Sequence, residues 1–214
     1  MTRLEVVSDP VCPWCYLGAA NLMRAVAAQE GHPFAIGWRP FQLDPTLPAG
    51  GMDRAAYMAA KFGDPSRLEA AHARLVEMGA ASGITYRFDL IRRAPNTLDA
   101  HRVIRWAEPE GLQTRTAMAL FRRYFELGED ISDPAVLRDA AEEAGLDGAA
   151  VEALLRGDAD RDAVRAEAGA AQEMGVTGVP TFIIAGQYVL TGAQPVEVWE
   201  DVIGQLEAAT PEAQ

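Results

Sequence analysis

A pair of cysteines between a short apolar run and a helix-forming stretch constrains this chain more than any other feature. Cys12 and Cys15 are the only cysteines, and two residues separate them. The apolar run at residues 4–8 predicts a strand, and residues 13–29 predict a helix. Backbone N–H groups in the first turn of a helix lack intrahelical partners, so they favour a thiolate there. The spacing predicts a reactive dithiol at a helix N-terminus.

Two inert interpretations of the cysteines are weaker than redox chemistry. A structural disulfide between them would close a very small loop and would constrain the unfolded chain little. A zinc site needs four ligands, but the histidines (His32, His72 and His101) are scattered and form no ligand-spaced pair. We therefore expect no metal site. A Cys-x-x-Cys motif next to a β-α-β pattern is typical of thiol redox chemistry.

Composition limits the partners and the compartment. The 214 residues include 19 Lys and Arg against 31 Asp and Glu, a formal net charge of −12 with no basic patch. This balance argues against a nucleic-acid partner. No stretch of about 18 apolar residues predicts a membrane span. The first predicted strand leaves no room for a leader peptide, so we expect a cytoplasmic protein, where a lone cysteine pair is more often catalytic than structural.

The order of predicted elements divides the chain into three blocks. Residues 34–39 alternate in polarity and predict a second strand, so residues 4–39 form a β-α-β unit. A helical period follows over residues 52–175, broken by Gly, Pro and Asp clusters. Two short strands at 181–184 and 187–190 predict a β-hairpin, and an amphipathic helix at 195–208 ends the pattern. The order is β-α-β, a helical block, then β-β-α.

Several segments in a fixed order resemble a known family. The matching segments are Ser8–Tyr16, Trp38–Leu43, Asn96–Arg102, Tyr124–Ser132, Gly178–Phe182 and Gly192–Pro195. Together they resemble the DsbA family of the thioredoxin superfamily, and within it the FrnE-like branch. That branch is related to 2-hydroxychromene-2-carboxylate isomerases and kappa-class glutathione transferases.

The resemblance implies an α/β thioredoxin fold, β-α-β … β-β-α, with a large all-helical insertion. Residues 1–41 and 176–214 would form the thioredoxin-like domain, and residues 42–175 the inserted helical subdomain. The proline before the third strand, Pro180, would be the cis-proline of this fold. A cis bond there would let Val179 present its backbone N–H and C=O beside the cysteines, where an extended substrate pairs with them.

The resemblance also implies a cytoplasmic thiol-disulfide oxidoreductase that acts on thiol- or disulfide-containing proteins or small molecules. Cys12 would be the nucleophile that forms a mixed disulfide, and Cys15 would resolve it. Besides the backbone of Val179, expected substrate-binding residues are Pro13, Trp14, Pro180, His101 and Asn96, with Trp14 exposed. For His101 a purely structural role stays open, and Asp9 is either a turn cap or a proton acceptor.

Two other functions remain open at this stage. Glutathione-dependent isomerases and transferases of this superfamily usually carry Ser in place of Cys12, lack the second cysteine, and have an acidic residue where Gln194 stands. These departures make glutathione a thiol cosubstrate at most, and no tightly bound cofactor is expected. The other alternative is a redox-sensing chaperone or binding module. The sequence is compatible with a monomer or a homodimer.

Overall fold

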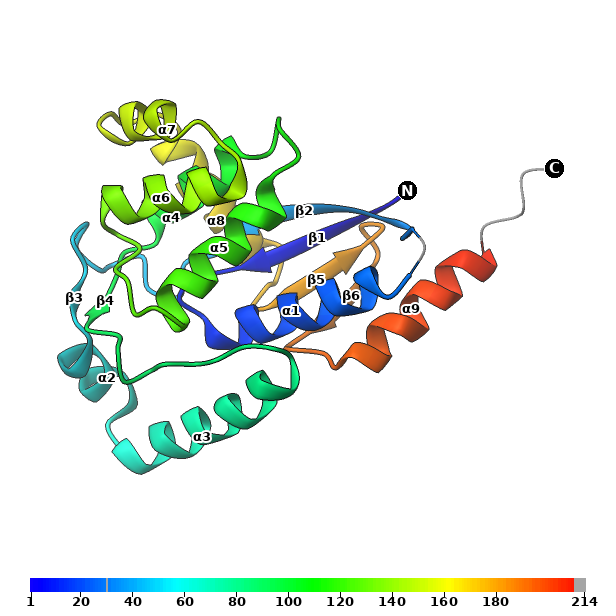
Figure 1. Cartoon of the computed structure of the whole chain (residues 1–214), viewed down its shortest axis with the longest axis horizontal. Helices are drawn as coiled ribbons and strands as arrows, with labels where there is room; N and C mark the ends of the chain where they lie inside the picture. Colours follow the sequence, from blue (N-terminus) through cyan, green and yellow to red (C-terminus); the bar gives the residue numbers. More distant parts are fainter. Residues whose placement is uncertain (30, 210–214) are drawn as a thin grey trace.

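The computed structural model of this protein describes residues 1–29 and 31–209 (Figure 1). The first and last blocks contain β1 (Thr2–Ser8), α1 (Pro13–Ala27), β2 (Phe34–Pro40), β5 (Thr181–Ile184), β6 (Tyr188–Thr191) and α9 (Val196–Ala209). Between them lie β3 (Met52–Asp53), α2 (Arg54–Phe62), α3 (Pro65–Ala81), β4 (Arg93–Ala94), α4 (Leu98–Trp106), α5 (Gln113–Phe125), α6 (Pro134–Ala144), α7 (Gly148–Leu155) and α8 (Arg161–Glu173). The predicted order of elements is confirmed.

A four-stranded mixed sheet with the order β2-β1-β5-β6 forms the centre of the fold. β1 runs parallel to β2, as the α1 crossover requires, and antiparallel to β5. The tight turn after β5 returns the chain as the antiparallel strand β6. Leu4, Val6 and Val7 of the central strand β1 are almost completely buried, because both faces of the sheet are covered.

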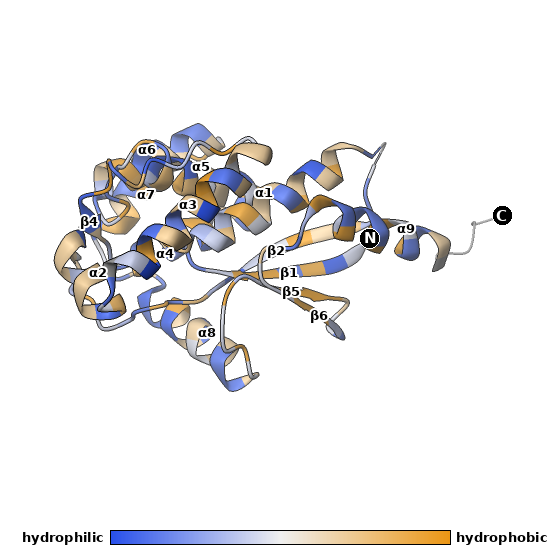
Figure 2. Cartoon of the chain, turned by 90° about the horizontal axis from the view of Figure 1, so that it is seen from below, coloured by the Kyte–Doolittle hydropathy of each residue, from blue (hydrophilic) through white to orange (hydrophobic). Residues whose placement is uncertain are grey.

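Helices cover the two faces unequally. α1 and α9 lie side by side on one face, and α8 lies on the opposite side of the sheet (Figures 1 and 2). The outer strand β6 is mostly exposed, including the side chains of Tyr188 and Val189. No helix within the described ranges is both long and apolar enough to cross a lipid bilayer.

The middle block is mostly helical, as predicted, but it contains one pairing that the sequence does not predict. Met52 and Asp53 pair with Ala94 and Arg93 as a two-residue antiparallel ladder, β3-β4. Gly51 makes this possible, because it adopts a positive φ of 65° and lies against the backbone of Ala94. The ladder fixes the start of α2 relative to the segment that precedes α4.

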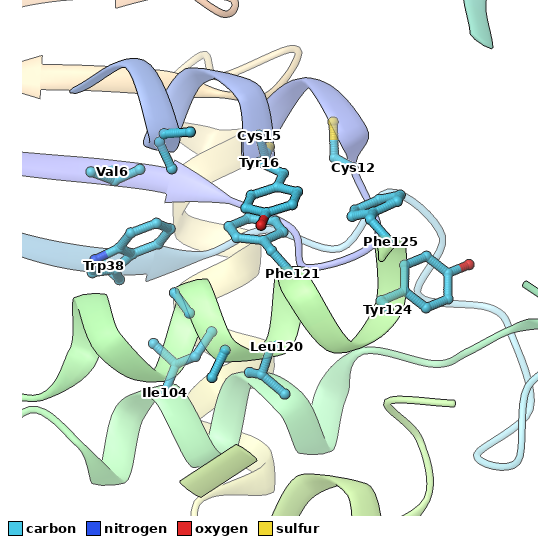
Figure 3. Close-up of a cluster of buried hydrophobic side chains, with 14 of the residues drawn as sticks. Val6, Cys12, Cys15, Tyr16, Trp38, Ile104, Leu120, Phe121, Tyr124 and Phe125 are labelled. Carbon is cyan, nitrogen blue, oxygen red and sulfur yellow. The ribbon is translucent and has the colours of Figure 1, made fainter. Parts of the chain in front are cut away.

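One apolar core joins the sheet, α1 and the inserted helices. The ring of Tyr16 on α1 stacks on Phe121 of α5 with 5.2 Å between centroids, and Phe125 lies 6.1 Å from Tyr16 (Figure 3). Trp38 of β2 also contacts Phe121, with 6.2 Å between the ring centroids. The division at residues 41/42 and 175/176 therefore stays a prediction, and its residues 210–214 lie outside the described part of the chain.

Candidate functional site

Cys12 is the N-cap residue of α1, where the helix leaves its first N–H groups without helical partners. Its own amide donates to the carbonyl oxygen of Asp9 at 2.9 Å, and its carbonyl oxygen accepts from the amides of Cys15 and Tyr16. Pro13 occupies the first helical position, where the lack of an N–H costs no hydrogen bond. The strand β1 and this turn thus hold the Cys12 sulfur at the positive end of the helix.

The loop before β5 approaches the same sulfur. The Val179–Pro180 peptide bond is cis, at the position where the sequence analysis places a cis bond. The Cys12 thiol donates to the carbonyl oxygen of Val179 with an Sγ–O distance of 3.7 Å. Gly18 of α1 permits this approach, since a β-carbon there would lie 3.1 Å from the Pro180 ring. Two segments 167 residues apart in the chain therefore meet at one thiol.

Cys15 lies one turn inside α1, and its thiol is deeper than that of Cys12. The exposed fraction is 1% for Cys15 and 4% for Cys12, and both are free thiols (Figure 3). Burial raises the pKa of the Cys15 thiol well above its ordinary value, and the neighbouring Cys12 thiol raises it further. The Ser8 side chain and the Asp9 backbone act in the opposite direction. Cys15 is therefore a protonated, shielded partner of Cys12 near neutral pH.

A groove of about 560 Å³ opens in front of Cys12. One side is formed by the first turn of α1, including Pro13 and Trp14, and by Val179. The other side is formed by α2 and α3, and its apolar part includes Leu68, Ala71 and Leu75. The structure thus brings together four of the predicted site residues, Cys12, Pro13, Trp14 and Val179, at one opening.

Trp14 and Pro180 are both less exposed than residues of a flat surface site would be. Trp14 is half-buried rather than exposed, because it packs in the groove and the Arg74 guanidinium lies 5.8 Å from its ring. The prediction of an exposed Trp14 is wrong in this respect. Pro180 is buried behind the loop, and its carbonyl oxygen accepts from Gly192.

His101 and Asn96 do not line the groove. His101 is buried, and its Nε2 lies 3.0 Å from the carbonyl oxygen of Phe41 and 3.7 Å from an oxygen of Asp9. The Asn96 amide donates to the carbonyl oxygen of Leu47 and accepts from the amide of Leu98. Both side chains thus have partners inside the protein, and their predicted role in substrate binding stays a prediction.

Asp9 connects the cysteine turn to the segment after β2. It is 1% exposed, and its carboxylate accepts from the Leu43 amide at 2.7 Å and, more weakly, from the Val11 amide at 3.5 Å. These bonds satisfy the turn-capping interpretation of Asp9. Across the described ranges, no group of three or more His, Cys, Asp or Glu side chains is placed to hold a metal ion.

The cationic part of the groove lining was not predicted from the sequence. The groove that Cys12 lines is also lined by Arg54, Tyr57 and Lys61 of α2 and by His72 of α3. One usable signal is that Leu68, Ala71 and Leu75 recur at helical spacing in the sequence, and this face of α3 lines the groove. The contribution of α2 depends on the β3-β4 ladder, for which the sequence carries no signal.

Comparison with known proteins gives consistent findings. The model of the family described as "DSBA-like thioredoxin domain" matches residues 3–204. The uncharacterised protein YwbO of Bacillus subtilis (strain 168) is 30% identical over 202 residues, which cover 94% of this chain and 95% of YwbO. The probable DsbA oxidoreductase SCO1869 from Streptomyces coelicolor has a TM-score of 0.84 at 31% identity, covering 100% of this chain and 93% of its own.

A more distant solved structure shares the fold. The cytosolic disulfide reductase DsbM from Pseudomonas aeruginosa, solved with GSH, has a TM-score of 0.70 at 20% identity. The match covers 96% of this chain and 99% of DsbM.

Proposed function

The chain belongs to the family of DSBA-like thioredoxin domains, and from this premise we propose that it is a thiol-disulfide oxidoreductase whose reacting pair is Cys12 and Cys15. The family agrees with the resemblance found in the sequence. The observation that carries the proposal is the Cys12 thiol at a helix N-terminus, beside the Val179 carbonyl and open to a groove. Thiolates are favoured at such positions, and thiolates are the attacking species in disulfide exchange.

In the reducing direction, the Cys12 thiolate attacks one sulfur of a substrate disulfide. A Cys12–substrate disulfide forms, the substrate S–S bond breaks, and the leaving thiolate takes a proton from water. Cys15 then loses its proton to water and attacks the Cys12 sulfur. The Cys12–Cys15 disulfide forms, the Cys12–substrate S–S bond breaks, and the second substrate sulfur leaves as a thiolate that takes a proton from water. The protein has lost two electrons and the substrate has gained them. The oxidising direction is the same sequence reversed, and the potentials of the two couples decide between them.

The groove and the Val179 backbone fit a substrate that is extended and partly apolar. An extended segment next to Val179 can pair with its backbone N–H and C=O. The similarity to DsbM, a cytosolic disulfide reductase, supports a cytoplasmic location for this protein. There, a small thiol would reduce the Cys12–Cys15 disulfide back to the dithiol. Because DsbM was solved with GSH, we include glutathione among the candidate thiol cosubstrates.

The assignment of roles is tested with three proteins: the wild type, Cys12→Ser and Cys15→Ser. Each is mixed with insulin and dithiothreitol for turnover, and separately with a peptide disulfide for mass spectrometry. We expect Cys12→Ser to lose turnover, and Cys15→Ser to accumulate the covalent peptide adduct on Cys12, because the resolving thiol is missing. Wild type that has been alkylated with iodoacetamide is the control for protein-independent exchange.

Three outcomes would overturn the proposal. Insulin reduction by Cys12→Ser at the wild-type rate would remove Cys12 from the reaction. Glutathione conjugation of an aromatic electrophile by the wild type, without disulfide exchange in the insulin assay, would favour a glutathione transferase instead. Suppression of aggregation by Cys12→Ser, with no turnover by the wild type, would favour the binding module.

A further inference from the structure

Arg54 is a buried cation without an acidic partner. Its exposed fraction is 9%, and its guanidinium donates to the hydroxyl of Tyr124 at 3.1 Å. Within residues 1–29 and 31–209, no carboxylate oxygen lies within 4.0 Å of this guanidinium, although most other buried or half-buried arginines of the protein are paired. A charge taken out of water is costly unless it is paired, so its partner is expected from outside the protein.

Arg54 lines the same groove as Cys12. The other cations of this groove are Lys61, which donates to the Tyr57 hydroxyl at 2.7 Å, and Arg67, which is exposed and lies 3.8 Å from Asp64. The lining thus holds Arg54, Lys61 and Arg67 in a chain whose net charge is −12.

The acids that share the groove are already occupied. Asp9 accepts from the Leu43 amide, and Asp44 accepts from the amide and hydroxyl of Thr46. The Thr46 hydrogen bonds hold the pKa of the half-buried Asp44 carboxyl below its ordinary value, with Lys61 adding to the effect. Neither carboxylate lies within ion-pair distance of Arg54, so the positive charge of Arg54 faces the groove uncompensated.

The charge of Arg54 also reaches His72, on the α3 part of the same side of the groove. Burial lowers the pKa of the His72 imidazole, and the Arg54 charge lowers it further. His72 stacks on Phe88 with 3.9 Å between ring centroids, so it presents a flat and mostly neutral surface. The groove therefore combines an apolar wall on α3 with one fixed, desolvated guanidinium.

We propose that Arg54 binds a carboxylate of the substrate, so that the groove selects aliphatic disulfides and thiols that carry a carboxylate a few bonds from the sulfur. This inference rests on the proposed oxidoreductase function and names the class of its substrate. A guanidinium matches a carboxylate with two parallel hydrogen bonds, which orients the substrate as well as holding it. The aliphatic part of the substrate would lie along Leu68, Ala71 and Leu75, with its sulfur at Cys12.

Single-turnover kinetics with three small disulfides tests this selection. The pre-reduced protein is mixed with 3,3′-dithiodipropionate, which is anionic, with 2-hydroxyethyl disulfide, which is neutral, or with cystamine, which is cationic. Each reaction converts one protein dithiol and one disulfide to a protein disulfide and two small thiols, so no other reductant is needed. The rate constants are divided by those of free cysteine with the same reagents, which removes intrinsic differences in reactivity.

We expect the corrected rate to fall in the order anionic, neutral, cationic for the wild type. Arg54→Met keeps the length of the side chain and removes the charge, and it should slow the anionic disulfide by about ten- to a hundred-fold, the range of hydrogen bonds to charged groups. The neutral disulfide should change by less than about twofold. Arg54→Lys should restore part of the anionic rate. Arg92→Met is the matched control, because it removes an equal charge from an exposed position outside the groove.

A second measurement needs no variant of Arg54. In Cys15→Ser protein, the alkylation of Cys12 by iodoacetate is compared with that by iodoacetamide, again relative to free cysteine. We expect a preference for the anionic reagent that falls as ionic strength rises. Equal corrected rates for both reagents, or an anionic-to-neutral disulfide ratio that Arg54→Met leaves unchanged, would overturn this inference. Absence of reaction with all three disulfides would instead overturn the proposed function.

Discussion

At the scale of residues, the two thiols of the site differ because they occupy different depths of one helical turn. Cys12 opens to the groove, whereas Cys15 is enclosed and sits close to Cys12 and Ser8. Burial is the largest reason that the pKa of Cys15 lies well above its ordinary value. A resolving thiol that is mostly protonated near neutral pH attacks more slowly than an ionised one, because the thiolate is the nucleophile.

The Cys15 titration can be measured in isolation. In a Cys12→Ala variant, thiolate absorbance near 240 nm should rise only above the ordinary thiol value of about 8.5. Removing Cys12 takes away the second cause of the shift but leaves the burial, so the direction should persist. The same variant in 6 M guanidinium chloride should titrate near about 8.5. A folded-state midpoint at or below the unfolded one would contradict this assignment.

The same pKa shift has a consequence for stability. Because the folded-state pKa of Cys15 is raised, its contribution to the free energy of unfolding is complete below the unfolded pKa and is lost as pH rises through the folded pKa. Buried tyrosines add to this, since burial also raises the pKa of Tyr124, to about 12. We expect urea midpoints that are constant to about pH 8 and then fall. Comparing Cys12→Ala with the Cys12→Ala/Cys15→Ala double variant isolates the cysteine part.

Individual residues of the site were predictable to the extent that local sequence determines them. Cys12 and Val179 are recognisable from the sequence, because each belongs to a short motif next to a predicted strand. The strand fixes the position of its motif in the fold. Arg54 was not predictable, because its burial depends on contacts with Tyr124, 70 positions further along the chain. His101 belongs to a matching motif, yet it does not line the groove, and its Nε2 lies against the carbonyl oxygen of Phe41 and an oxygen of Asp9.

At the scale of elements, the packing of α1 against the start of β5 brings the Cys12 thiol to the Val179 carbonyl. Gly18 marks the closest approach, and a β-carbon there would lie 3.1 Å from Pro180, 3.2 Å from Phe182 and 3.3 Å from the Ala193 backbone. Phe182 is fully buried, so its ring cannot swing aside. The glycine is thus required by space and not by a positive φ.

Substitution of Gly18 tests how tightly α1 is seated. Alanine is favoured over glycine in a helix by about 1 kcal/mol, but overpacking of a buried site costs about 1 to 3 kcal/mol, so Gly18→Ala should destabilise or at best be neutral. Gly204→Ala on α9 is the matched control, because nothing lies within 4 Å of its added carbon and it should stabilise by about 1 kcal/mol. Urea unfolding measures both, and equal stabilisation by the two would refute the close seating of α1.

The prediction of elements was accurate where a period or a turn motif extends over several residues. The strands of the central sheet and the terminal helix differ from their predicted bounds by a few residues at most. The β3-β4 ladder was missed, because two residues on each side are too few for an alternating pattern. Its partners are about 40 positions apart, so only the folded chain brings them together.

At the scale of the whole molecule, the sheet and the inserted helices share one core. Phe121 is 1% exposed, and its ring contacts both Tyr16 of α1 and Trp38 of β2. Tyr86, in the segment between α3 and β4, donates to the carbonyl oxygen of Pro13 at 2.6 Å, so the insertion also holds the cysteine turn directly. The inserted block is thus held to the sheet and to α1 both through α5 and through the segment that follows α3.

This shared core predicts that the protein unfolds as one unit. Calorimetry should give a single transition whose calorimetric and van't Hoff enthalpies agree. Phe121→Ala removes a ring from the junction, so it should lower Tm by about 6 to 20 °C, the product of the usual cost of such a cavity and the Tm shift per kcal/mol at this chain length. The transition should stay single.

Tyr188→Ala on the exposed edge of β6 is the control and should change Tm little. Two separate transitions in the wild type, with Phe121→Ala moving only one of them, would mean that the insertion is an independent domain and that the groove between α1 and α3 is an interface able to open.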